Sequence, residues 1–287
     1  MQQVGLRATK PARFLRTNRQ TGQRANKTMC LILFAYHHHP HYPLILAANR
    51  DEFYDRPTQP LDFWPDRPGI AAGRDLKRMG TWLGINRHGR LAAVTNYREA
   101  GVQRPEARSR GRLVADFLAG NSAVTGYLDR LHAGGHQYNG FNLIVGDARE
   151  LYYFSNRGGK PSAVQPGIHG LSNHLLDTCW PKVRDGKSRM AAVLAENETD
   201  IHRQRLLEAL EDQCIPPEDQ LPHTGVGKEW ERMLAPIFIT STAYGTRCSS
   251  LLTIDIQGEV DFTEITWQPV EPRPTKIGEK HIRFKIY

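Results

Sequence analysis

The chain has 287 residues and a formal net charge of +8 at pH 7, with 38 Lys and Arg against 30 Asp and Glu. This length is sufficient for one large domain with its own apolar core. No apolar stretch reaches membrane-spanning length, so we expect no stable membrane insertion. The four cysteines are widely spaced and include no Cys-x-x-Cys pair, which argues against a zinc site and a disulfide scaffold and favours a reducing cytoplasm.

The basic charge is concentrated at the start of the sequence. Residues 1–28 contain seven Lys and Arg and no Asp or Glu, so residues 29–287 have a net charge near +1. We therefore expect no binding of nucleic acid by the folded part. Residues 1–28 can be read as a mistaken upstream start, an organellar transit peptide or a disordered basic arm, because they lack a secretory apolar region. A transit peptide would make the location mitochondrial.

The first half of the remaining chain is dominated by predicted strands. Short apolar runs at 31–36 and 44–48 flank a turn that contains two prolines, which predicts a β-hairpin. A long loop rich in Pro, Asp and Arg is expected from Asp51 to about Gly80. A second hairpin is predicted from residues 82–85 and 91–95.

Helices and strands alternate in the second half. Helical spacing predicts one helix over 112–118, ending at Gly120, and another that Ser122 caps and that ends at Gly134-Gly135. The further expected elements are strands 141–145 and 151–154, helices 182–196 and 200–212, and strands 237–240, 249–256 and 260–267. Pro269, Pro272 and Pro274 predict a frayed tail. This order indicates an α+β fold, with antiparallel sheet covered by helices, in a single domain over 29–270 followed by a tail over 271–287.

Cys30 directly follows Met29 and opens the first predicted strand. If translation starts at Met29 and that methionine is removed, Cys30 becomes the first residue. Its thiol is then a nucleophile with a base, the α-amine, on the same residue. An internal Cys30 has no such base, so the chemistry depends on which form exists.

Other candidate site residues lie where predicted strands end. Asn49-Arg50-Asp51-Glu52 ends the second strand, and a carboxylate there could orient the amine of Cys30. The alternative is a solvated strand end. Asn96 and Asn173 also lie near strand ends, where an amide can donate to an oxyanion or can simply be a turn residue.

Basic residues suggest two further features. Arg247 precedes a strand and could face a thiolate or carboxylate, or could lie at a surface edge, while the neighbouring Cys248 is expected to be a buried small apolar residue. A glycine-containing basic patch could hold the phosphates of a coenzyme-A-like ligand, although a solvated loop is the commoner case. That patch consists of Arg67, Arg74, Lys77 and Arg78, close to Trp82.

We expect no native metal site. His37, His38, His39 and His41 form a histidine tract, but no Asp, Glu or His at ligand spacing completes it. Haem ligation by a Tyr, His or Cys elsewhere in the chain remains an alternative. There is no Walker sequence and no G-x-G-x-x-G, so nothing supports nucleotide hydrolysis or dinucleotide binding.

Several of these segments together resemble the NRDE family, which is that of Transport and Golgi organisation protein 2. The resemblance covers roughly residues 29–270. It is carried by Met29-Cys30-Leu31-Ile32, Ala48-Asn49-Arg50-Asp51-Glu52-Phe53, Arg56-Pro57, Ala72-Gly73-Arg74-Asp75-Leu76, Gly80-Thr81-Trp82-Leu83-Gly84, Thr95-Asn96-Tyr97-Arg98, Gly140-Phe141-Asn142-Leu143, Leu171-Ser172-Asn173 and Tyr244-Gly245-Thr246-Arg247.

The family in turn resembles N-terminal-nucleophile hydrolases, nearest to choloylglycine hydrolases and cysteine-type penicillin acylases, which implies an αββα four-layer sandwich. By position, Cys30 matches the nucleophile, Asp51 the aspartate at its amine, and Asn96 and Asn173 the asparagines at the oxyanion and amine. Arg247 matches the arginine near the thiol. One departure is that those hydrolases have an arginine a few residues before the aspartate, where this chain has Ala48.

Two functions follow as expectations. One is a cysteine hydrolase or acyl transferase acting on a C–N amide or a thioester bond, with catalytic residues Cys30, Asp51, Asn96, Asn173 and Arg247. The other is a non-catalytic protein that carries haem or acyl-coenzyme A, ligands that the resemblance implies. The residues expected to bind ligand are Asn49, Arg50, Glu52, Arg74 and Trp82. Either function requires a small-molecule ligand or substrate and no obligatory cofactor, and the sequence leaves the oligomeric state undetermined.

Overall fold

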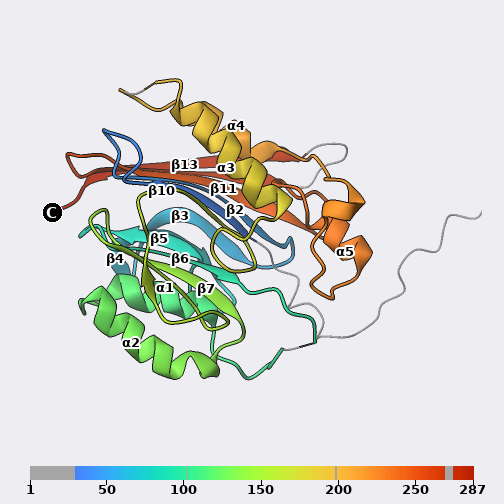
Figure 1. The fold of residues 1–287 in the computed structure, drawn as a ribbon. Helices are drawn as coiled ribbons and strands as arrows, with labels where there is room; N and C mark the ends of the chain where they lie inside the picture. The colour runs from blue at the N-terminus through green and yellow to red at the C-terminus, as the bar shows by residue number, and fades with distance from the viewer. Residues whose placement is uncertain (1–29, 102, 198, 269–273) are drawn as a thin grey trace, which may run out of the picture.

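A computed structural model describes residues 30–101, 103–197, 199–268 and 274–287. The predicted basic leader therefore lies outside the described residues. Two antiparallel sheets lie face to face, with helices on the outer face of each sheet, as Figure 1 shows. The αββα four-layer sandwich expected from the resemblance is confirmed.

The first sheet has the strand order β10-β1-β2-β11-β12-β13, and helices α3 and α4 pack on its outer face. The bounds of these elements are β1 Cys30–Tyr36, β2 Leu44–Phe53, β10 Gly167–Leu171, β11 Tyr244–Ile254, β12 Glu259–Gln268, β13 Thr275–Lys285, α3 Pro181–Leu194 and α4 Arg203–Glu208. A short helix, α5 Lys228–Met233, lies at one end of the sandwich (Figure 1).

The second sheet has the order β3-β4-β5-β6-β7-β8-β9, and α1 packs on its outer face beside α2. Its elements are β3 Thr58–Trp64, β4 Arg67–Asp75, β5 Leu83–Asn86, β6 Leu91–Asn96, β7 Phe141–Gly146, β8 Leu151–Ser155, β9 Ser162–Ala163, α1 Arg110–Ala119 and α2 Val124–Gly134. Single turns of 3-10 helix occur at Gly135–Gln137, Ala209–Glu211 and Glu218–Gln220.

The central strands are buried on both faces, which explains their continuous apolar runs. In β1, Ile32 and Phe34 pack between the two sheets, whereas Leu31 and Leu33 pack beneath the helices on the other face. The same period of two separates the faces of β2. A third apolar cluster fills the space between the second sheet and helices α1 and α2.

Three parts of the sequence prediction are wrong. The expected loop over 51–80 contains the end of β2 together with β3 and β4. Pro60 was misleading because it lies in β3, an edge strand, where proline is tolerated. Residues 237–239 are buried and Thr240 is exposed, and residues 237–240 form no strand. The expected frayed tail instead contains β13, which pairs with β12 along its length.

The helix predictions need smaller corrections. Residue 123, not Ser122, precedes α2, and no side chain caps that helix. The helix expected over 200–212 is the short α4 followed by a turn of 3-10 helix. The two hairpins, strands 141–145 and 151–154 and the helix expected at 182–196 are confirmed. Among the helices of the described residues, none has the length and apolar character needed to cross a membrane.

Candidate functional site

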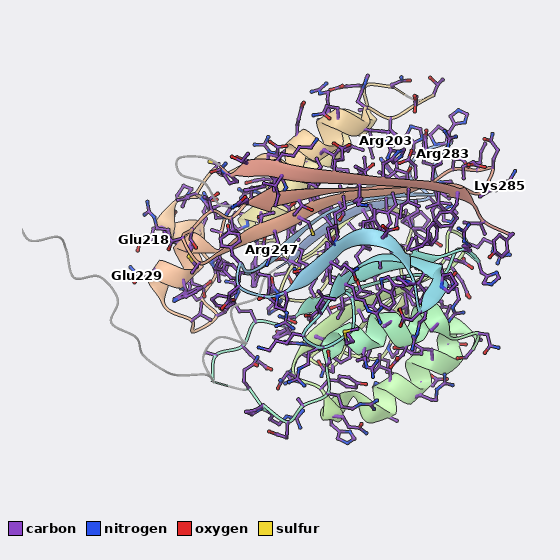
Figure 2. All side chains as sticks on the ribbon, turned by 180° about the vertical axis from the view of Figure 1, so that it is seen from behind. Arg203, Glu218, Glu229, Arg247, Arg283 and Lys285 are labelled. Carbon is purple, nitrogen blue, oxygen red and sulfur yellow. The ribbon has the colours of Figure 1, made fainter. Side chains whose placement is uncertain are left out.

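A cavity of about 840 Å³ opens where the two sheets and the start of α1 meet. Its wall includes Cys30 from β1, Arg50 and Glu52 from β2, Asn96 from β6 and Arg110 from α1. Arg247 also lines it, and Figure 2 shows this arginine toward the same end of the sandwich as Glu218 and Glu229, with Lys285 at the opposite end. The cavity therefore draws on elements from both sheets.

Strand register places Cys30 on the cavity side of its sheet. Cys30 lies opposite Arg50 of β2, and Arg50 lies opposite Cys248 of β11. Directly paired residues on antiparallel strands point to the same face, so the two thiols flank one guanidinium in a row that faces the cavity. The expectation that Cys248 is buried is confirmed.

The backbone of Cys30 is bonded to two residues that follow β10. Its nitrogen donates to Oδ1 of Asn173 at 3.3 Å, and its carbonyl oxygen accepts a hydrogen bond of 3.1 Å from Oγ of Ser172. Nδ2 of Asn173 donates to the carbonyl oxygen of Asn96 at 2.8 Å. These bonds bring three of the predicted site residues, Cys30, Asn96 and Asn173, into contact.

The environment of the Cys30 thiol favours its protonated form. Burial, followed by the negative charge of Asp51, raises its pKa to about 12, although Arg50 and the backbone N–H of Asp51 act in the opposite direction. At neutral pH the thiol must therefore lose its proton to a base before it can act as a nucleophile. The nitrogen of Cys30 is such a base only when it is a free α-amine.

The carboxylate of Asp51 is almost completely buried. Oδ1 accepts a hydrogen bond of 2.6 Å from Oγ1 of Thr246. Burial raises the pKa of Asp51 to about 6, and the nearby charge of Lys182 is the largest influence that lowers it. Asp51, which also borders the cavity, therefore titrates near pH 6.

The arginines of the wall have different partners. Arg50 and Arg56 pair with Glu52 at 3.6 Å and 3.5 Å. Nη1 of Arg247 donates to the backbone carbonyls of Phe53, Tyr54 and Arg56 at 3.0, 3.2 and 3.0 Å. Arg247 thus lies at the cavity, as predicted, but it fixes the chain that follows β2.

The ligand-binding role expected of Asn49 is wrong, because this side chain faces the helices. Asn49 is fully buried, and its Nδ2 donates to the carbonyls of Leu210 and Ile237 at 2.8 Å and 2.9 Å. Its Oδ1 accepts a hydrogen bond of 2.7 Å from Ser249. The described hydrogen bonds of this amide all join it to neighbouring protein groups, and Asn49 does not line the cavity.

The predicted basic patch lies mainly on the cavity wall. Arg74 and Trp82 line the cavity, and Arg74 also stacks 4.3 Å above the ring of Trp64 and bonds Asp66. Lys77 and Arg78 line the cavity too. Arg67 does not, and its Nη1 reaches the carbonyl of Ala115 at 3.4 Å.

Sequence reasoning missed Lys182, Thr246, Arg110 and Glu264. Lys182 is 3% exposed and lies on the same face of α3 as Gly186 and Met190, which are also buried. The helical spacing of residues 182, 186 and 190 is the signal that could have revealed the buried position of Lys182. Arg110 lies just before the helix predicted over 112–118 and Glu264 lies within the strand predicted over 260–267, and both line the cavity.

The histidine tract shows no metal-binding arrangement. His39 is buried, and its Nδ1 accepts a hydrogen bond of 3.2 Å from the backbone nitrogen of His41. Within the described part of the chain, no three His, Cys, Asp or Glu residues are grouped as metal ligands.

Two solved structures show a distant similarity to this chain. A Caenorhabditis elegans orthologue of N-acylethanolamine-hydrolyzing acid amidase has a TM-score of 0.42 and 11% identity, over 78% of this chain and 92% of that one. A mutant of the conjugated bile acid hydrolase from Clostridium perfringens has a TM-score of 0.37 and 9% identity, over 90% of this chain and 88% of that one. These TM-scores are too low to support an inference about chemistry.

Sequence relatives are much closer. The Transport and Golgi organization 2 homologue of Mus musculus is 38% identical, covering 82% of this chain and 92% of the relative. The homologue of Bos taurus is 40% identical with the same coverage, and the family model described as Transport and Golgi organisation 2 matches residues 29–269. The chain therefore belongs to the Transport and Golgi organisation 2 family.

Proposed function

We propose that this protein is a cysteine-nucleophile hydrolase or acyl transferase that acts on an amide or thioester bond when Cys30 is its first residue. The observation that carries the proposal is the position of Cys30. Its side chain faces the cavity, and its nitrogen lies 3.3 Å from Oδ1 of Asn173. An α-amine held in that position is available to accept the proton of the thiol.

The proposed reaction has two steps. The α-amine of Cys30 takes the thiol proton while Sγ bonds to the substrate carbonyl carbon, and the C–N or C–S bond of the substrate then breaks. The leaving amine or thiol receives that proton, which leaves an acyl thioester on Cys30. Water or an acyl acceptor then attacks the thioester carbonyl and releases Cys30 with its proton.

The asparagines have separate roles in this scheme. Oδ1 of Asn173 binds the amine, and its Nδ2 is occupied by the carbonyl of Asn96. We therefore assign stabilisation of the oxyanion to the side-chain amide of Asn96, which lines the cavity. Asp51 and Arg247 set the charge around the thiol and the shape of the wall.

Direct acylation of Cys30 tests this function. The chain that begins at Cys30 is incubated with a long-chain acyl amide or an acyl-coenzyme A thioester, and bound acyl groups are located by peptide mass spectrometry. We expect an acyl group on Cys30 and turnover that is lost in Cys30→Ala. Cys214→Ala, which changes an exposed thiol, is the matched control and keeps full turnover. Full turnover in Cys30→Ala would exclude the proposal.

The charge of the cavity favours a second candidate, a carrier for an anionic ligand such as haem or acyl-coenzyme A. Nine Lys and Arg but only five Asp and Glu line the cavity. Within the described residues, Lys77, Arg78, Arg104 and Arg108 have no ion pair with a carboxylate. Such side chains are suited to phosphate or carboxylate groups.

A carrier binds its ligand without the thiol. If the protein is a carrier, we expect palmitoyl-coenzyme A or haemin to bind saturably to Cys30→Ala as tightly as to the parent chain. We expect Arg78→Ala and Arg108→Ala to weaken this binding. Isothermal titration at two salt concentrations measures both effects. Absence of saturable binding for both ligands would contradict the carrier function.

A further inference from the structure

The face of the first sheet that is turned away from the cavity carries a second group of ionisable residues. Strand alternation places the side chain of Asp51 on the face opposite to Arg50 and Glu52, although Asp51 also borders the cavity at the end of β2. On that face Asp51 bonds Thr246, and α3, which carries the buried Lys182, packs against the neighbouring strand β1. No direct hydrogen bond or ion pair joins Lys182 and Asp51 within the described residues. Neither the cavity nor the proposed acyl transfer uses Lys182 directly.

Lys182 is an unusual residue to find at this position. It is 3% exposed, and its Nζ has no hydrogen-bond partner among the described residues. Oδ2 of Asp51 likewise has no partner within that part of the chain. A buried lysine or carboxylate is strongly destabilising unless an opposite charge compensates for it, so each of these two groups requires a nearby countercharge.

The surroundings of Lys182 identify its countercharge. Burial lowers the pKa of Lys182 to about 8, Asp51 is the main group that raises it, and Cys30 contributes less in the same direction. The positive charge of Arg98 lowers the pKa of Lys182, but Arg98 is itself paired with Glu231 of α5. The lysine is also the second residue of α3, where the helix dipole disfavours positive charge. Asp51 is therefore the main neighbouring charge that favours the charged form of Lys182.

The dependence is mutual. Of the groups that lower the pKa of Asp51, Lys182 ranks before the hydrogen bond of Thr246 and the charge of Arg50, while Glu52 acts against them. We propose that Lys182 is a positioning residue that keeps Asp51 ionised beneath Cys30 and so fixes the charge around the thiol. This inference relies on the proposed function only in taking Cys30 as the reacting residue.

The test measures Asp51 directly and requires no substrate. The chain is labelled with ¹³C at the aspartate carboxyls and titrated by NMR, and Asp51→Asn assigns the signal. In Lys182→Met we expect the acid dissociation constant of Asp51 to fall at least tenfold, an upward shift of one pH unit in the midpoint. Lys182→Arg should restore the midpoint of the parent chain.

A matched control lies on the same helix. Lys187 is partly exposed and pairs with Asp177 at 2.6 Å, so Lys187→Met should leave the Asp51 midpoint unchanged. An Asp51 midpoint that is the same in Lys182→Met and the parent chain would overturn the inference. The proposed function can fail separately, because absence of acylation at Cys30 leaves this titration unaffected.

A second variant covers the case in which Lys182→Met does not fold. Removing both buried charges in Lys182→Met with Asp51→Asn eliminates the unpaired carboxylate that the single change leaves. We expect the double variant to fold and to be more stable than Lys182→Met in urea unfolding. A double variant no more stable than the single one would contradict a charge coupling between the two residues.

Discussion

The nitrogen of Cys30 lies 3.3 Å from Oδ1 of Asn173, a residue 143 positions later in the chain. The contact joins the first strand of one sheet to the segment that follows β10, its neighbour in that sheet. Because Asn173 also bonds the carbonyl of Asn96 at the end of β6, one amide connects both sheets at the cavity. The position of the reactive nitrogen thus depends on the packing of the two sheets.

Replacement of this amide tests that dependence. Asn173→Ala leaves the half-buried nitrogen of Cys30 and the carbonyl of Asn96 without their bonds, so we expect a loss of about 1–3 kcal/mol in the free energy of unfolding. Urea unfolding measures it. Asn121→Ala, at an exposed position, is the control and should change stability by less than about 0.5 kcal/mol. Equal stability of both variants would show that the Asn173 bonds contribute nothing.

The bond between Thr246 and Asp51 predicts an effect that depends on pH. The folded pKa of Asp51 is about 6, above the ordinary aspartate value of 3.8. The stability that protonated Asp51 contributes is therefore present below about pH 4 and is lost as pH rises through 6. Thr246→Val removes a bond to the carboxylate and raises that pKa further. Urea unfolding should therefore show a larger destabilisation at pH 7.5 than at pH 4.5, and an equal loss at both would contradict it.

The buried ion pair of Arg98 and Glu231 predicts a large loss of stability. The two side chains are 2% and 5% exposed, and Oε1 of Glu231 also accepts bonds from Thr224. Arg98→Met leaves a buried carboxylate without its cation, which should cost about 3–5 kcal/mol in thermal or urea unfolding. The exposed pair of Lys228 and Glu218 is the comparison, and Lys228→Met should cost less than about 1 kcal/mol.

The raised pKa of Cys30 predicts slow alkylation. In the chain that retains Met29, little of the thiol is ionised at pH 7, because its pKa is about 12. Peptide mass spectrometry after iodoacetamide treatment should show Cys30 reacting at least tenfold more slowly than the exposed Cys214, with its rate rising about tenfold per pH unit up to pH 9. A Cys30 rate that matches Cys214 at pH 7 would rule out this environment.

Much of the site could be predicted because its residues lie in short segments with specific patterns. Cys30, Arg50 and Asn96 occupy strand ends that hydrophobic runs identify, and the structure brings them to one cavity. Asn49 was misassigned because adjacent residues of a strand face opposite sides. The sequence alone did not show which side of β2 would face the cavity.

The remaining errors concern long-range contacts. Thr246 bonds Asp51, and the charge of Lys182 acts on Asp51, only because β11 packs on β2 and α3 packs on its neighbour β1. Both residues are far from Asp51 in the sequence. Residues 237–239 resemble a strand in composition, but the backbone nitrogen of Ile239 bonds Oγ1 of Thr246 and that of Phe238 bonds the carbonyl of Asp212. Tertiary partners of this kind override local propensity.

The N-terminal residue of the protein purified from its native source is the most direct test of the proposed chemistry. Intact mass and N-terminal sequencing identify it. The account predicts a chain that begins at Cys30, whose α-amine lies beside Asn173 and can accept the thiol proton. A native protein that retains Met29 or any earlier residue would lack that amine, which would contradict the proposed acyl transfer and leave the carrier function as the better explanation of the cavity.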